Sequence, residues 1–259
     1  MIGIYGELGQ YPLFIDALIN MVKYYARLRI SSDGMLQDAL LENRSQNKQG
    51  KASWLKSMST LEVQVNNGPF KELDQNYIRS IKSKLQAGFQ SEWKKKLETD
   101  YRKDGISKNK LRTYRKFKDS LEQECYLTLV RNKQARKCLT KLRLSDHNLH
   151  IETGRHLARR LPVDQRLCKL CKLNKVEDEF HFLMECEVYS EMRSDFLNAL
   201  HELHPSTRDL TMEQKAAWLL GNPFANVVVP VANFVLKCFN LREKVAKDMI
   251  DKCANQEEV

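Results

Sequence analysis

Apolar residues recur along most of the chain at intervals of three or four, which is the spacing of one face of an α-helix. The clearest case is the segment 71–97, whose apolar side chains include those at 78, 81, 85, 89, 93 and 97. Alternating apolar and polar positions, the pattern of a β-strand, are hard to find. We therefore expect a mainly α protein with a bundle-like assembly of helices. The expected helices cover residues 11–30, 35–41, 54–63, 71–97, 107–130, 132–145, 190–203 and 211–221, and a last one begins near Pro230.

One apolar stretch, residues 216–236, carries no charged residue and is long enough to span a bilayer. It contains the sequence GNPFAN at 221–226, then Pro230 and Asn233, which interrupt a helix and add polar groups that lipid does not satisfy. A membrane span is the alternative. We expect a pair of buried helices with a turn at 221–223, and no membrane partner.

The charge of the chain is unevenly placed. The net charge is +10, and residues 93–175 hold 24 Lys and Arg against 9 Asp and Glu. All of the excess positive charge therefore lies in one contiguous third of the chain. Such an asymmetry indicates a polyanionic partner, and nucleic acid is the usual one.

Four of the possible metal ligands in the chain lie close together, in the sequence LCKLCKLNKVEDEFHFLMEC at 167–186. Cys168, Cys171, His181 and Cys186 have the spacing C-x2-C-x9-H-x4-C. Three thiolates and one imidazole suit the tetrahedral coordination of Zn²⁺. The alternative is that the cysteines are simply buried. Four protein ligands leave no open position for water, so the sequence predicts a structural zinc site.

The remaining histidines and cysteines fit this interpretation. His147, His150 and His156 are more typical of structural side chains than of ligands. The seven cysteines are an odd number and lack the density of a disulfide scaffold, which favours a reducing, intracellular compartment, nuclear or cytoplasmic. The basic runs KKK at 94 and RKFK at 115 are weak signals for the nucleus.

Basic residues surround the motif, and we expect them to contact phosphates, the alternative being a solvated basic face. The candidate contacts are Arg155, Arg159, Arg160, Arg166, Lys169, Lys172 and Lys175, with Arg112, Arg115 and Lys116 upstream. The aromatic residues Tyr101, Tyr114 and Phe117 lie among basic residues and could stack on single-stranded bases. Trp93 belongs to the apolar face described above, so we expect it in the core.

The sequence RKDG at 102–105 ends the strongest helical pattern and marks the expected domain boundary. We expect an N-terminal helical region at 1–104 and a basic helical region at 105–259, with the zinc knuckle at 163–190 followed by C-terminal helices. Neither a P-loop, a G-x-S-x-G nor an H-E-x-x-H motif occurs in the sequence, and Y-x-D-D is also missing. The expectation is a non-enzymatic protein without a small-molecule substrate.

Several stretches together resemble one known family. They are YGELGQYPLFIDALINMVKYYARL, KASWLKSM, QECYLTLVRNKQARKCLTKLRLSDHNLHIETGRH, VDQRLCKLCKLNKVEDEFHFLMECEVYSEMR and WLLGNP. In this order they are similar to the segment downstream of the polymerase domain in LINE-type, non-LTR retrotransposon reverse transcriptases of animals. The most specific part is 143–193.

The resemblance implies a mainly helical tail with a zinc knuckle that grips template RNA or target DNA, and Cys168, Cys171, His181 and Cys186 match the knuckle ligands. The endonuclease and polymerase domains of that family have no counterpart in the sequence, so polymerisation is not implied. The polymerase domain itself is a second candidate partner. A different interpretation remains open, namely a protein-interaction scaffold in which zinc only holds the fold together.

Overall fold

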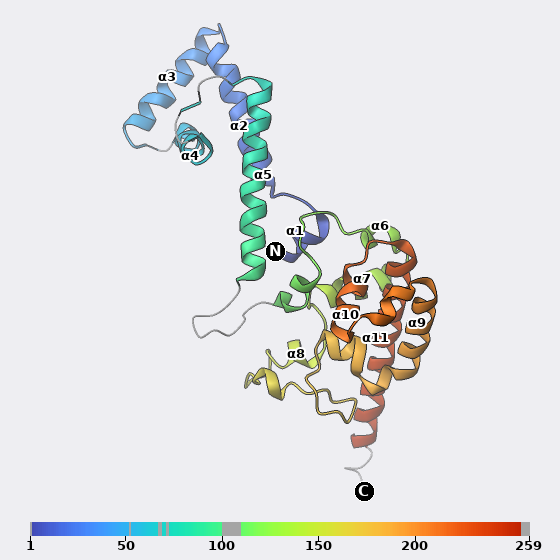
Figure 1. The fold of residues 1–259 in the computed structure, drawn as a ribbon. Helices are drawn as coiled ribbons and strands as arrows, with labels where there is room; N and C mark the ends of the chain where they lie inside the picture. Colours follow the sequence, from blue (N-terminus) through green and yellow to red (C-terminus); the bar gives the residue numbers. More distant parts are fainter. Residues whose placement is uncertain (1, 52, 67–68, 71–72, 100–109, 255–259) are drawn as a thin grey trace. The chain divides into compact units, whose positions relative to one another are not determined.

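The structure is a computed structural model that describes residues 2–51, 53–66, 69–70, 73–99 and 110–254. The expected mainly α architecture is confirmed: the described part of the chain consists of helices and connecting loops, with two isolated β-bridges and no strand (Figure 1). The chain divides into two compact units, residues 10–96 and residues 1–9 with 97–259. The expected boundary at 104/105 lies outside the described residues.

The unit of residues 10–96 is built from four helices. They are α2 (Leu13–Ile30), α3 (Gly34–Lys48), α4 (Trp54–Asn66) and α5 (Gln75–Glu98), the last of which ends just beyond this unit. Their apolar faces enclose a core that includes Ile19, Val22, Leu40, Leu61 and Ile81. The periodicity of the sequence predicted all four, because each helix has its own apolar face.

The helix α3 is longer than expected. We expected it to stop at Leu41, before the polar sequence ENRSQNKQG, but it continues to Lys48. Asp33 caps its start, since its side chain accepts a hydrogen bond from the N–H of Leu36. The polar sequence contains neither Pro nor Gly before Gly50, so nothing in it breaks the helix.

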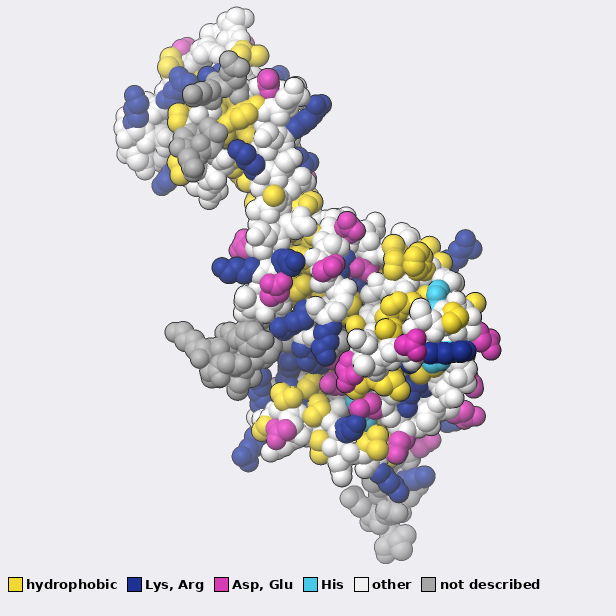
Figure 2. Space-filling model, viewed as in Figure 1, with side chains coloured by type: hydrophobic (Ala, Val, Ile, Leu, Met, Phe, Trp, Pro, Cys, Tyr) yellow, Lys and Arg dark blue, Asp and Glu magenta, His cyan; other side chains and the backbone are white. Residues whose placement is uncertain are grey.

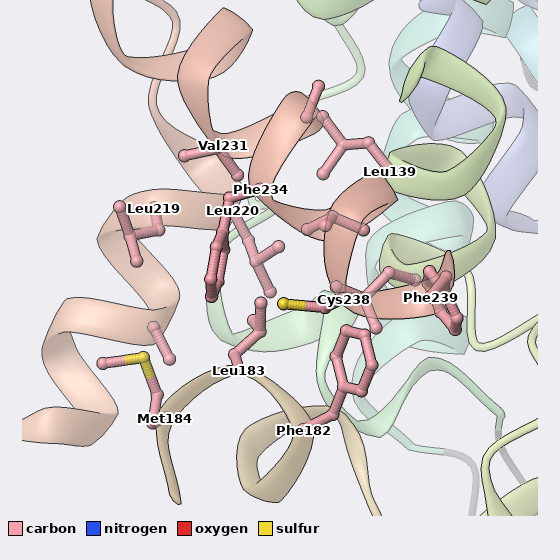
Figure 3. Close-up of a cluster of buried hydrophobic side chains, with 14 of the residues drawn as sticks. Leu139, Phe182, Leu183, Met184, Leu219, Leu220, Val231, Phe234, Cys238 and Phe239 are labelled. Carbon is pink, nitrogen blue, oxygen red and sulfur yellow. The ribbon is translucent and has the colours of Figure 1, made fainter. Parts of the chain in front are cut away.

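The second unit is organised around α11 (Ala225–Ala254), which contacts several other helices of the unit. The other α-helices of the unit are α1 (Ile2–Leu8), α6 (Tyr126–Leu129), α7 (Lys133–Arg143), α8 (His150–Thr153), α9 (Ser190–Leu203) and α10 (Met212–Gly221). Their shared core includes Leu139, Phe182, Leu220, Val231 and Cys238 (Figure 3). Phe182 comes from the Cys/His segment, so this segment contributes directly to the core of the unit.

The expected helix over 107–130 is wrong. Residues 107–109 lie outside the described part, and the rest forms two short 3-10 turns, Lys110–Arg112 and Tyr114–Lys116, followed by the four-residue α6. Between them the chain pairs with the end of α1, where the N–H of Glu124 donates to the carbonyl of Glu7 at 2.9 Å. Tertiary backbone pairing has replaced local helix formation, although the apolar spacing was helical.

The helices α10 and α11 form the expected buried pair. They meet at residues 222–224 and are bent by 106° with respect to each other. Leu219, Leu220, Val227 and Val228 are all buried. Among the described residues no single helix is long and apolar enough to cross a membrane, and this bent pair passes that test only by length and composition. The helix α11 begins at Ala225, earlier than expected, and Pro230 lies inside it.

Candidate metal centre

Cys168, Cys171, His181 and Cys186 converge as the spacing predicted. Their ligand atoms all lie within 4.8 Å of one another, so the group could hold a metal ion. Sγ of Cys168 lies 4.0 Å from Sγ of Cys186, and Sγ of Cys171 lies 3.4 Å from Nε2 of His181. Cys168, His181 and Cys186 are buried, and Cys171 is partly exposed.

A short backbone loop presents the first two cysteines. Leu167 and Val176 form an isolated antiparallel bridge. The N–H of Cys168 donates to the carbonyl of Lys175 at 2.8 Å, which closes the loop between them. Asn174 adopts a left-handed conformation with φ of 52°, which an Asn tolerates better than most residues. The loop therefore holds both thiols in place without any regular secondary structure.

Backbone N–H groups favour the charged form of each thiol. Those of Leu170 and Cys171 lower the pKa of Cys168, that of Leu173 acts in the same direction on Cys171, and that of Val188 on Cys186. The hydrogen bond with Cys186 does most to lower the pKa of the Cys168 thiol, with His181 and the N–H groups of Leu170 and Cys171 adding to it. The same hydrogen bond raises the pKa of Cys186, and burial raises that of Cys171. Hydrogen bonds to the charged form stabilise a thiolate, which is the form that binds metal.

His181 is the first residue of a π-helix, His181–Glu185, and Cys186 follows that helix directly. The N–H of Cys186 donates to the carbonyl of His181 at 2.8 Å, five residues back. In an α-helix, with roughly 3.6 residues per turn, positions five apart point about 140° away from each other. The wider π-turn brings them to the same side, and such turns are frequent at functional sites. The spacing H-x4-C therefore suits this geometry.

A carboxylate orients the imidazole from the other side. Nδ1 of His181 lies 3.4 Å from Oε2 of Glu185, while Nε2 faces the thiols. Glu185 also pairs with Lys175, whose Nζ lies 2.6 Å from Oε1. A carboxylate on the far nitrogen fixes the ring tautomer and raises the basicity of a metal-binding histidine. Glu185 thus supplies the outer support that a metal site of this kind uses.

The acidic sequence EDE at 177–179 connects the ligand segment to the helices. Asp178 accepts from the N–H of His181 at 2.8 Å, as expected for the first turn of a helix. Glu177 instead forms a buried ion pair with Arg242 of α11, with Nε and Oε1 2.9 Å apart. Sequence reasoning missed this role, because the partner lies 65 residues away.

Glu179 is the most deeply buried of the three. Its carboxylate accepts from Arg112 at 2.7 Å and from Ser145 at 2.6 Å, and lies 2.9 Å from Nε2 of His147. Burial alone raises the pKa of a carboxyl, but His147, Arg112 and Ser145 together lower that of Glu179 to about 2. His147 and His150 are structural, as expected: Nδ1 of His150 lies 2.8 Å from the carbonyl of Leu167.

Nine of the ten predicted phosphate contacts separate into two groups. Arg159, Arg160, Lys169, Lys172, Lys175 and Lys116 are exposed, as required. The other three, Arg112, Arg115 and Arg155, are half-buried and already have partners. Arg112 forms ion pairs with Glu152 and Glu179, and Arg155 forms one with Glu152. Arg115 donates to the carbonyl of Glu98. Lys and Arg side chains lie on the visible surface of the unit of residues 1–9 and 97–259, with acidic residues between them (Figure 2).

Arg166 is not available to a phosphate, and we remove it from the candidate surface. Its side chain is buried, and its guanidinium donates to the carbonyls of Leu161 and Ile151. It therefore holds together the segment 151–161, which runs from α8 into the following loop. Gly154 permits this, because a Cβ at that position would lie 2.8 Å from Cγ of Arg166.

The aromatic residues do not form the stacking platform that the sequence suggested. Tyr114 is fully buried, and the guanidinium of Arg143 lies over Phe117 at 4.6 Å from the ring centroid. Trp93 is buried, as expected. Tyr101 lies outside the described residues.

Comparison of the chain with protein-family models, with curated proteins and with solved structures finds no match in any of the three.

Proposed function

We propose that this chain is a zinc-dependent, non-enzymatic nucleic-acid-binding protein. Zinc follows from the ligand set, because three thiolates and one imidazole in a tetrahedral group are typical of structural zinc sites. The four ligands Cys168, Cys171, His181 and Cys186 fill the coordination sphere, so the ion would shape the surface and not activate a water molecule.

Exposed cations flank the Cys/His group in sequence on both sides of the first cysteine: Arg159 and Arg160 before it, Lys169 and Lys172 after it. No ion pair holds these four side chains to any other described residue, so they are free to meet phosphates. The fixed loop from Cys168 to Lys175 would hold two of them on one rigid element.

The resemblance to the tail of LINE-type reverse transcriptases supports the same proposal. The partner would be RNA or single-stranded DNA, and the polymerase domain of such an enzyme is a further candidate. The free cysteines fit a reducing compartment, nuclear or cytoplasmic.

A second candidate function, a protein-interaction scaffold, is favoured by the unit of residues 10–96. Its surface exposes several large apolar side chains, among them Leu13, Ile30 and Met35, each more than 80% exposed. Exposed apolar groups of this size are typical of protein interfaces when they form a patch. In this case zinc would serve only to hold the fold together.

The test compares the affinity of three proteins for a short single-stranded RNA across a range of salt concentrations. The variant Lys169→Ala/Lys172→Ala removes two proposed contacts, and Lys244→Ala/Lys247→Ala, two exposed residues of α11, is the control of equal charge. The variant Lys169→Ala/Lys172→Ala should reduce the slope of log affinity against log salt by about 1.5 relative to the wild type. Each lost phosphate contact lowers the steepness of this slope by about 0.7 to 0.9. Equal slopes in the two variants would contradict the proposal.

A further inference from the structure

The helix α7 carries a line of lysines on its outer face. Ala135, Leu139, Leu142 and Arg143 are buried against the core, whereas Lys133, Lys137 and Lys141 are exposed. Residues four apart lie on one ridge of a helix, so consecutive lysines are separated by about 6 Å along its axis. None of the three forms an ion pair with another described residue. The ridge is a row of free, evenly spaced cations.

A groove runs beside this ridge, between α7 and α11. Its volume is about 590 Å³, within the range of sites that bind small organic groups. The lining residues are Asn132, Gln134, Lys137, Cys138, Lys141, Asp146, His147, Asn148, Leu236, Phe239, Asn240 and Glu243. Two ridge lysines therefore belong to the wall of the groove, so a ligand that bridges ridge and groove would touch both.

Amide side chains are concentrated in the groove. Those of Gln134, Asn148 and Asn240 are exposed and make no hydrogen bond to other residues of the described ranges. An amide offers a donor and an acceptor side by side, which matches the edge of an adenine base. Glu243 adds an acceptor suited to an exocyclic amino group. Amides and a carboxylate in one groove are able to pair with the edge of a base.

Three of the lining residues are apolar side chains, Cys138, Leu236 and Phe239. Cys138 is partly exposed, Leu236 is partly exposed, and Phe239 is 8% exposed. The ring of Phe239 is held by Phe182, with centroids 4.6 Å apart, and both rings lie in the core of the unit (Figure 3). The flat, apolar face of a base could contact these side chains while its polar edge meets the amides.

We infer that the α7–α11 groove is a second nucleic-acid site, which takes one unpaired base of a single strand while Lys133, Lys137 and Lys141 contact its phosphates. A base inside a duplex presents neither its face nor its pairing edge, so the site would favour single strands. The inference rests on the proposed function and deepens it, because it names single strands as the substrate class and adds a site remote in sequence from the Cys/His group.

Cys138 provides a direct probe of the groove. The zinc-loaded protein is treated with N-ethylmaleimide alone, with a saturating single-stranded RNA or DNA, and with a duplex of the same length. Modification is then read peptide by peptide by mass spectrometry. Cys125, which is exposed and does not line the groove, is the internal control. Saturation is established separately, by measuring the bound oligonucleotide.

We expect single strands to slow the modification of Cys138 several-fold, duplex to have little effect, and Cys125 to react at the same rate throughout. The variant Lys137→Ala/Lys141→Ala should lose this protection, whereas Lys244→Ala/Lys247→Ala should keep it. Bound single strand with no protection of Cys138 would overturn the inference and leave the proposed function intact. Protection by single strand and duplex alike would overturn the strand preference. No binding of any oligonucleotide would overturn both proposals.

Discussion

Nε2 of His181 lies 3.4 Å from Sγ of Cys171, although ten residues separate them in the chain. Two local structures bring them together: the closed loop after Cys168, and the π-turn that begins at His181. The same ring presents Nδ1 to Glu185. The ligand group is thus built from short-range backbone geometry with an outer carboxylate in support.

Replacing Glu185 tests this outer support. The substitution Glu185→Gln keeps the size of the side chain but removes the charge beside Nδ1 of His181. We expect zinc affinity to fall about 10- to 100-fold, as is usual when an outer partner of a metal-binding histidine is lost. Competition with a chromophoric chelator measures the affinity. The substitution Glu187→Gln, two residues on and exposed, should leave it unchanged. Equal affinities in the two variants would contradict the role of Glu185.

Removing a ligand should have a larger effect. In Cys171→Ser the hydroxyl is a poor ligand, and a structural zinc ion contributes roughly 10–16 kcal/mol to folding in peptide systems. We expect the purified variant to lose its zinc and its fixed structure around 166–186, and to bind RNA more weakly. Metal content by mass spectrometry and hydrogen exchange check this. The control is Cys125→Ser, which changes an exposed thiol outside the group and should keep the metal. Unchanged zinc content and affinity in Cys171→Ser would refute the assignment of the site.

The buried carboxylate of Glu179 should make stability depend on pH. Its pKa falls from an ordinary 4.5 to about 2 on folding, so the folded state favours the charged form. The charged carboxylate therefore adds roughly 3 kcal/mol to the free energy of unfolding. This stabilisation is complete above pH 4.5 and is lost as the pH falls toward 2. The difference in the free energy of unfolding between wild type and Glu179→Gln should shrink as the pH falls from 4.5 toward 2.

Denaturant unfolding at each pH gives this difference. The control Glu202→Gln alters an exposed carboxylate on α9 and should unfold like the wild type at every pH. A wild-type advantage over Glu179→Gln that did not change below pH 4.5 would show that the carboxylate acts by packing alone.

The turn after α1 depends on a glycine. Gly9 has φ of +60°, and a Cβ there would lie 2.2 Å from the backbone N of Gln123. The substitution Gly9→Ala should destabilise the protein by at least about 1 kcal/mol, because the left-handed conformation alone costs that much. Gly34, at the start of α3, has nothing within 4 Å of its would-be Cβ. Gly34→Ala should be neutral or slightly stabilising in thermal unfolding. A loss of stability in Gly34→Ala as large as in Gly9→Ala would contradict this account.

Features with local causes were predictable from the sequence. The helix α10 begins after Thr211, whose side chain accepts from the N–H of Gln214 while Gln214 bonds back, and both residues can be recognised in the sequence. The four ligands were recognisable by their spacing alone. The loop that presents the first two and the π-turn that joins the last two are each formed by only a few consecutive residues. The helix α9 covers the expected range for the same reason: its apolar positions follow its own periodicity.

Features with distant causes were not predictable. Arg143 is buried because Glu7, 136 residues away, and Glu124 accept its hydrogen bonds. Arg166 resembles its exposed basic neighbours in sequence, and only the carbonyls around it distinguish it. The helical spacing of residues 111–121 was misleading, because pairing with α1 satisfies the backbone of 122–124 instead. In each case the deciding partner comes from another part of the fold.

The most direct test of the central claim is the affinity of the purified protein for a short single-stranded RNA and for its DNA counterpart at two salt concentrations. Bound zinc is counted first, and the measurement is repeated after chelation. We predict one zinc ion per chain, affinity that falls steeply with salt, and loss of binding when the zinc is removed. Zinc present in the protein with no binding of either strand would contradict the account and leave the metal as a structural element only.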